Sequence, residues 1–160
     1  GLSSNDSVVD PHLVKNTEWG AIALLSKSEY GKETEEVYIN NNSNFITGIA
    51  GDTASAGSST EATNKYDTTN GQKASTNGNV TGIYDMSGNV WEWCWDWYNK
   101  DFYLTESGDN PKGPERGTER CLRGGSWDSS QYSLRSANRL KDSPYKKTEF
   151  YGFRLARTVN

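Results

Sequence analysis

The sequence predicts an α+β domain with short strands, few helices and much irregular loop. Apolar residues recur at helical spacing in one segment near the start of the chain, and strict alternation, which is typical of a strand, occurs in one segment near its middle. Long stretches rich in Asn, Ser, Thr and Gly separate such segments. The hydrophobic content is only 32%, but six Trp and nine Tyr supply large rings for a core, which a disordered chain would lack.

The length and charge of the chain bound its class. Its 160 residues fit one domain spanning 1–160, because soluble domains typically have about 100–200 residues. The first residue is Gly1 rather than Met, so we also consider that the chain is the C-terminal part of a longer one. No stretch approaches about 18 consecutive apolar residues, so we expect no direct membrane insertion. The net charge of -4 argues against nucleic acid as a partner.

The first regular element expected is a helix over about 17–30, after an irregular lead-in over 1–15. Asn16 suits the N-cap and Glu18 the first turn. Gly31 suits a left-handed helix end. The residues expected on the buried helix face are Trp19, Ile22, Ala23, Ser26 and Tyr30.

A short strand is expected at 37–39, and it is followed by a polar loop insertion over 40–79. The insertion consists mainly of Asn, Ser, Thr, Gly and Ala, which bury too little area to order a segment by themselves. We expect Phe45, Ile46 and Tyr66 to anchor it.

The clearest strand follows the Ser87–Asn89 turn and carries Trp at positions 91, 93, 95 and 97. Period-2 spacing places these four indoles on one face and Glu92, Cys94 and Asp96 on the other. A row of indoles is either a wall of the core or an aromatic platform for a ligand. We favour the core wall, because the chain has few other large apolar groups to bury.

The rest of the chain is expected to hold two further strands. Residues 99–119 are predicted to form a polar loop, and residues 121–127 a strand that ends at a double glycine. From residue 128 the chain shows no periodicity until a last short strand at 152–156.

The Cys and His content disfavours common catalytic sites. Cys94, Cys121 and His12 are the only thiols and imidazole in the sequence, whereas a structural zinc site needs four N or S ligands. A nucleophile with a histidine base would have to use His12, beside Pro11 near the chain start. We therefore expect no catalytic residues.

Three blocks together carry a resemblance to a known family. They are GIYDMSGNVWEW at 82–93, LRGGSW at 122–127 and GFRLA at 152–156. Their order and content resemble the formylglycine-generating-enzyme (sulfatase-modifying factor) branch of the C-type-lectin fold. The resemblance implies a C-type-lectin-like α+β domain with short antiparallel strands. It is strong over 80–127 and 134–156 and weak before 80, where residues 16–19 look like the start of the family's second helix.

Enzymes of this family use a cysteine pair placed after the Gly-Gly-Ser-aromatic motif. In this chain the corresponding segment, 128–133, contains no cysteine, and a hydroxyl cannot replace a thiolate as copper ligand or redox group. We therefore expect no oxidase activity and no redox or nucleotide cofactor.

The C-terminal part also resembles the variable region of diversity-generating retroelement target proteins, here over 121–156. In those proteins, randomisation of template adenines leaves residues such as Ser, Asp, Tyr, Phe, Leu and Thr. The resemblance implies a ligand-binding variable face made of Asp128, Ser129, Ser130, Gln131, Tyr132, Ser133, Leu140, Lys141, Asp142, Ser143, Tyr145, Lys146, Lys147, Thr148, Phe150 and Tyr151.

This face is expected to bind a protein or glycan on a cell surface, since Tyr and Ser are typical of adaptable binding surfaces. The chain would then be a phage receptor-binding or bacterial surface adhesin protein, located on a phage particle or a bacterial cell. The alternatives are a formylglycine-generating-type enzyme and an inactive structural domain of the same fold.

Two further expectations come with the resemblance. A calcium ion would be bound by Asp85, Gly88, Val90 and Glu92, a set of oxygen donors that suits a hard cation. Cys94 and Cys121 would lie on neighbouring strands, close enough to form a disulfide if the compartment is oxidising.

Overall fold

The computed structural model describes residues 9–25, 41–42, 45–46, 83, 85–105, 113–126, 129 and 131–159. Its elements follow the chain in the order β1 (Val9–Leu13), α1 (Asn16–Leu25), β2 (Asn41–Asn42), β3 (Phe45–Ile46), β4 (Trp91–Trp97), α3 (Phe102–Thr105), β5 (Arg120–Arg123), α4 (Gln131–Leu134), β6 (Leu140–Asp142), β7 (Tyr151–Phe153) and β8 (Leu155–Val159). None of the helices in these ranges has the length and hydropathy of a membrane span.

The central unit is a four-stranded sheet with the order β6-β5-β4-β7. The β4–β5 and β5–β6 pairs are antiparallel, but β4 and β7 are parallel. The β4–β7 pair is thus an exception to the expected antiparallel pairing of short strands. Because β6 and β7 run in the same direction at opposite edges of the sheet, the chain between them crosses from one edge to the other.

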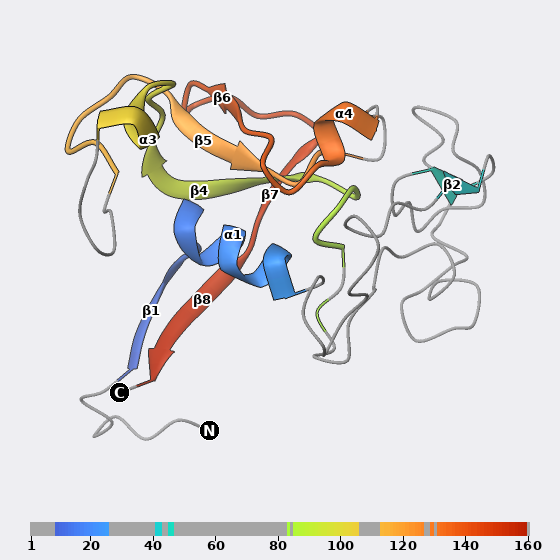
Figure 1. Cartoon of the computed structure of the whole chain (residues 1–160), viewed down its shortest axis with the longest axis horizontal. Coiled ribbons are helices and arrows are strands. Elements are labelled where there is room, and N and C mark those ends of the chain that lie inside the picture. Colours follow the sequence, from blue (N-terminus) through green and yellow to red (C-terminus); the bar gives the residue numbers. More distant parts are fainter. Residues whose placement is uncertain are drawn as a thin grey trace.

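A second ladder joins the two ends of the chain. β1 pairs antiparallel with β8, and Val9 lies opposite Val159. Figure 1 shows this ladder extending away from the four-stranded sheet, beside α1. The predicted irregular lead-in over 1–15 is thus wrong over residues 9–13. Pro11 is compatible with β1, because among the described strands β1 pairs with β8 alone.

Several smaller expectations meet the structure in part. The predicted helix is present over its described part as α1, with Trp19 and Ala23 buried, whereas Ser26, Tyr30 and Gly31 lie outside the described residues. The strand near 121–127 is present as β5. Within the predicted insertion over 40–79, β2 and β3 pair antiparallel. The predicted strand at 37–39 and the predicted anchor Tyr66 lie outside the described residues.

The inward face of β4 is the polar one, so the predicted indole wall is wrong. Glu92, Cys94 and Asp96 are buried, whereas Trp95 is 57% exposed. On the indole face only Trp91 is buried, and Trp93 and Trp97 are half-buried. The alternation was predicted correctly, but the two carboxylates and not the indoles face the core.

Those inward carboxylates hold α1 against the sheet. Asp96 accepts a hydrogen bond of 2.7 Å from the backbone N–H of Asn16, which is the first residue of α1. Glu92 accepts one of 2.7 Å from the indole N–H of Trp19, whose side chain is fully buried. An unpaired N–H group at a helix N-terminus is costly to bury. Asp96 on the polar face of β4 supplies the acceptor for this group of α1. Around these contacts a small core forms from Val14, Trp19, Ala23, Met86, Cys94 and Cys121.

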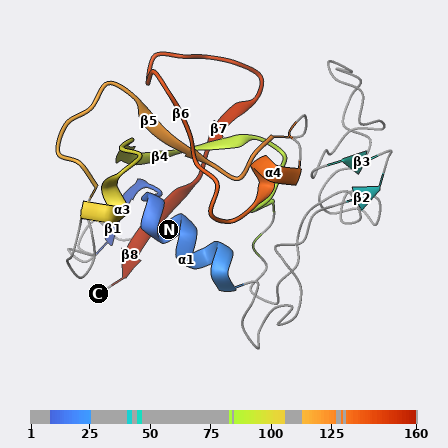
Figure 2. The same ribbon diagram turned by 45° about the horizontal axis from the view of Figure 1, so that its top comes forward.

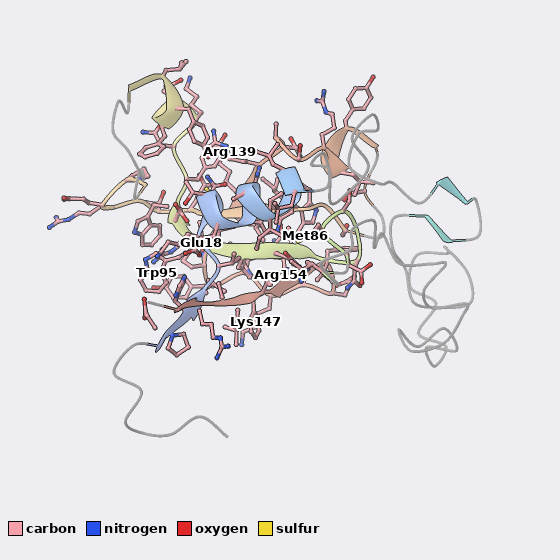
Figure 3. All side chains as sticks on the ribbon, turned by 60° about the horizontal axis from the view of Figure 1, so that its bottom comes forward. Glu18, Met86, Trp95, Arg139, Lys147 and Arg154 are labelled. Carbon is pink, nitrogen blue, oxygen red and sulfur yellow. The ribbon has the colours of Figure 1, made fainter. Side chains whose placement is uncertain are left out.

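Glu92 also binds the other end of the chain. Its carboxylate accepts hydrogen bonds of 2.6 Å and 3.1 Å from the Arg154 guanidinium. Arg154 lies between the ribbons of β4 and β8 in Figure 3. Burial raises the pKa of Glu92, and this effect outweighs the lowering by Arg154 and by the Trp19 indole. A single buried carboxylate thus connects α1, β4 and the junction of β7 with β8.

We predict opposite effects for two glycine substitutions. A methyl group on Gly152, which lies opposite Glu92 in the parallel pair, would stand 2.8 Å from Val90 Cγ2. Gly152→Ala should therefore lower the free energy of unfolding by about 1–3 kcal/mol. In α1, a methyl group on Gly20 would make an ordinary contact of 3.6 Å with Arg123. Gly20→Ala should leave stability unchanged or raise it by up to about 1 kcal/mol.

Urea unfolding of both variants beside the parent chain measures the difference. Equal stability of the two alanine variants would show that β7 is not packed against Val90 as described.

Candidate functional site

The predicted variable face contains two stretches that the structure brings together, 140–143 and 145–151. Asp142, the last residue of β6, accepts a hydrogen bond of 2.8 Å from the hydroxyl of Tyr151, the first residue of β7. Burial and this hydrogen bond raise the pKa of Tyr151 to about 12. The same bond and the Ser143 N–H hold the pKa of Asp142 below its ordinary value. The Tyr151–Asp142 hydrogen bond therefore joins the two ends of the connection between β6 and β7.

The side chains on this connection differ in exposure. Tyr145 is 89% exposed, and its neighbours Lys146 and Lys147 are exposed as well. A turn at its start is closed by the Lys146 N–H, which donates 2.9 Å to the Ser143 carbonyl. Phe150 is half-buried, with its N–H donating 2.9 Å to Thr148 Oγ1. Exposed side chains thus sit on a backbone that is held by its own hydrogen bonds.

Tyr151 belongs to the scaffold and not to the exposed part. Its ring stands edge-on to Trp93, with 5.3 Å between ring centroids. It is half-buried, and in the parallel register it lies opposite Trp91. Tyr151 therefore joins β6, β7 and β4, and its contact with a ligand stays a prediction.

Lys141 and Leu140 lie on β6 beside this connection. Lys141 is exposed and forms an ion pair of 2.6 Å with Glu119, whereas Leu140 is half-buried. The ion pair raises the pKa of Lys141. In the antiparallel pairing of β6 with β5, Lys141 lies opposite Cys121 and Leu140 lies opposite Leu122.

The first predicted stretch, 128–133, lies partly within the described residues. Ser129 binds back to Ser126, and Ser133 is half-buried, while Tyr132 is 75% exposed on α4. Asp128, Ser130 and the side chain of Gln131 lie outside the described residues. Figure 2 shows α4 apart from the arch between β6 and β7. A single surface that joins all three stretches stays a prediction.

The predicted turn at the double glycine positions α4. Gly124 and Gly125 have φ angles of 91° and 76°, which L side chains rarely adopt. A methyl group on Gly125 would stand 2.5 Å from Leu134, which is fully buried. The turn therefore lets α4 pack close to the end of β5.

An aromatic cleft borders the connection between β6 and β7. Its volume is about 290 Å³, and it is lined by Leu13, Trp93, Cys94, Trp95, Arg120, Pro144 and Phe153. Trp95 and Phe153 are 57% and 66% exposed. The guanidinium of Arg120 lies 5.1 Å from the ring centroid of Trp95 and 3.7 Å from that of Trp97. Trp93 and Trp95 of the Trp row thus line a cleft, which is what the alternative of an aromatic ligand platform requires.

The turn expected to bind calcium, with the first residues of β4, is held by hydrogen bonds within the protein. Asp85 has a φ of 57°, and Gly88 donates its N–H over 2.8 Å to the Gly124 carbonyl. The Glu92 carboxylate accepts hydrogen bonds from Arg154 and Trp19. In the described ranges no group of three or more His, Cys, Asp or Glu side chains could hold a metal ion. Calcium binding through Asp85, Gly88, Val90 and Glu92 stays a prediction.

The two cysteines lie on neighbouring strands, as expected. Trp93 pairs with Leu122 in the antiparallel β4–β5 ladder, and the two cysteines follow at the irregularity that separates this pair from the Trp97–Arg120 pair. Both are buried free thiols rather than a disulfide. Burial raises the pKa of Cys121 to about 11 and that of Cys94 well above its ordinary value.

Comparison with known proteins identifies relatives of this chain. The family model "Sulfatase-modifying factor enzyme 1-like domain" matches residues 12–159. Serine/threonine-protein kinase pkn1 of Chlamydia pneumoniae is 46% identical over 84 residues, which cover 51% of this chain and 14% of that protein. Formylglycine-generating enzyme of Thermomonospora curvata is 42% identical over 84 residues, covering 49% and 28%.

Two solved structures share the fold. Treponema denticola variable protein 1 matches with a TM-score of 0.60 and 29% identity over 94% of this chain and 48% of that one. PvdO from Pseudomonas aeruginosa matches with a TM-score of 0.59 and 22% identity over 93% and 53%. This chain thus spans about half the length of both structures. The resemblance to a variable protein of C-type-lectin fold is confirmed, and the chain belongs to the sulfatase-modifying factor enzyme 1-like domain family.

Proposed function

We propose that this chain is a ligand-binding display protein whose variable face is diversified by a retroelement. The observation that carries the proposal is the connection between β6 and β7. It presents the exposed side chains of Tyr145, Lys146 and Lys147, while the Tyr151–Asp142 hydrogen bond pins the strands on both sides. Such an arrangement lets the side chains change while the fold is kept.

The chemistry of the exposed residues suits recognition. Tyrosine supplies a large contact area at a low cost in side-chain entropy. Lys146 and Lys147 would attract an acidic ligand. The bordering aromatic cleft, with Trp95 and Phe153 half to two-thirds exposed, supplies apolar surface that does not depend on the variable positions. The structural likeness to a variable protein supports the same function.

The proposed partner is a protein or glycan on a cell surface, and the proposed location is a phage particle or a bacterial surface. An enzyme of the formylglycine-generating type is the second candidate, because relatives with that name match half of the chain. The states of Cys94 and Cys121 argue against an enzyme of this type, because buried cysteines with raised pKa values are poor nucleophiles.

We predict that Tyr132→Ala and Tyr145→Ala together remove binding without unfolding the chain. Both rings are largely exposed, and exposed side chains contribute little to stability. The unfolding midpoint should move by no more than about two degrees. Binding is measured on a glycan array and on a panel of intact bacterial cells that retain the parent chain.

The matched control is Leu104→Ala, which removes an 84% exposed side chain on α3 that is not part of the predicted face. It should leave binding unchanged. The display function would be refuted by a double tyrosine variant that binds the same cells and glycans as the parent.

We also predict that neither thiol reacts in the folded chain. Iodoacetamide at pH 8 should leave Cys94 and Cys121 unlabelled over hours and should label both in guanidinium chloride, because the native thiols are buried and protonated. Mass spectrometry counts the added groups. Fast labelling of one native thiol would instead support the enzyme reading.

A further inference from the structure

We propose that a second pocket, on the α1 side of the sheet, binds a small molecule through its anionic group. The pocket has a volume of about 350 Å³, and Gly20, Leu24, Tyr103, Arg123, Ser136 and Arg139 line it, together with Ala137. In Figure 3 Arg139 lies next to α1, whereas Lys147 lies beyond β4 on the other side. This anion pocket, as we call it, is therefore separate from the connection between β6 and β7, and the inference does not rest on the proposed function.

The pocket holds two guanidinium groups whose hydrogen-bond partners in the described part of the chain are neutral. Arg123 is 5% exposed and donates 2.5 Å and 2.6 Å to the carbonyls of Asn138 and Ser136. Arg139 donates 3.2 Å and 3.5 Å to the carbonyls of Asn99 and Lys100. The ion pairs found among the described residues include neither arginine.

Aromatic rings cover the faces of these cations and supply no opposite charge. Arg123 lies 4.5 Å from the ring centroid of Trp19, and Arg139 lies 4.7 Å from that of Tyr103. The Nε–H of Arg123 has no hydrogen-bond acceptor among the described groups. Burial and the nearby charge of Arg139 both lower the pKa of Arg123.

Two positive charges in one partly buried pocket create a strong attraction for an anion, because the protein interior screens charge less than water does. A planar guanidinium fork matches the oxygens of a carboxylate or a phosphate. The volume also leaves room for a body the size of a sugar ring, and Tyr103 and Leu24 offer it apolar contact. The ligand class is therefore a carboxylate or phosphate carried on a small ring-sized body.

Isothermal titration of the full chain with glucuronate, glucose 6-phosphate, inorganic phosphate and glucose tests the inference. The first two compounds distinguish the carboxylate from the phosphate source, inorganic phosphate tests the bare anion, and glucose is the neutral probe. At least one charged sugar should bind more than about tenfold tighter than glucose, and more weakly as salt is added. Equal binding of the three sugars, or no binding of any, would overturn the inference.

Two pairs of variants locate the binding. Arg139→Gln should weaken anion binding by about tenfold or more. Arg135→Gln should leave anion binding unchanged, because Arg135 is exposed, lies over the Tyr132 ring and does not line the pocket. Should Arg139→Gln unfold, Leu24→Glu and Leu24→Gln replace it, because Leu24 is 60% exposed at the rim. The glutamate variant should bind the anion more weakly than the glutamine variant, and equal affinities would refute the site.

Discussion

Both oxygens of the Glu92 carboxylate accept hydrogen bonds from elements far away in the sequence. Trp19 is 73 positions before it, and Arg154 is 62 positions after it. A buried carboxylate without partners would be strongly unfavourable, so α1 and the β7–β8 junction must both come to β4. The β1–β8 ladder then follows, because β1 leads directly into α1, and β8 directly follows Arg154. The position of the sheet edge that carries the candidate site also depends on this contact, since β7 begins that junction.

The same contact explains where sequence patterns were sufficient and where they failed. Alternation predicted the strand at β4, and the motif blocks predicted the turn at Gly124 and Gly125. Alternation defines two faces of a strand but not which one is buried. At β4, Trp19 and Arg154 determine which face is buried, because they donate hydrogen bonds to the Glu92 carboxylate. No local sequence pattern shows that this carboxylate is buried. β1 was missed because its partner lies at the other end of the chain, and α3 and α4 are four residues long, too short to show a helical period.

The candidate site was predictable to a similar degree. The motif blocks indicated that 128–151 would carry exposed side chains, and Tyr132 and Tyr145 bear this out. The anchoring of Tyr151 by Asp142 and Trp93 was not predictable, because a half-buried tyrosine and an exposed one look alike in sequence. The anion pocket depends on arginines that bind main-chain carbonyls, and such contacts leave no mark in residue spacing. Physically, the molecule separates a core that contains a buried ion pair from a connection whose central side chains, Tyr145, Lys146 and Lys147, are exposed.

A double-mutant cycle between Glu92 and Arg154 tests this account most directly. The free energies of unfolding of the parent chain, Glu92→Gln, Arg154→Gln and the double variant give the coupling energy of the pair. For a buried pair that holds the elements together we expect about 2 kcal/mol or more, and we expect almost no coupling in the matching cycle for the exposed pair of Glu119 and Lys141. If the Glu92–Arg154 coupling were as small as that of the exposed pair, the fold would not depend on the buried carboxylate.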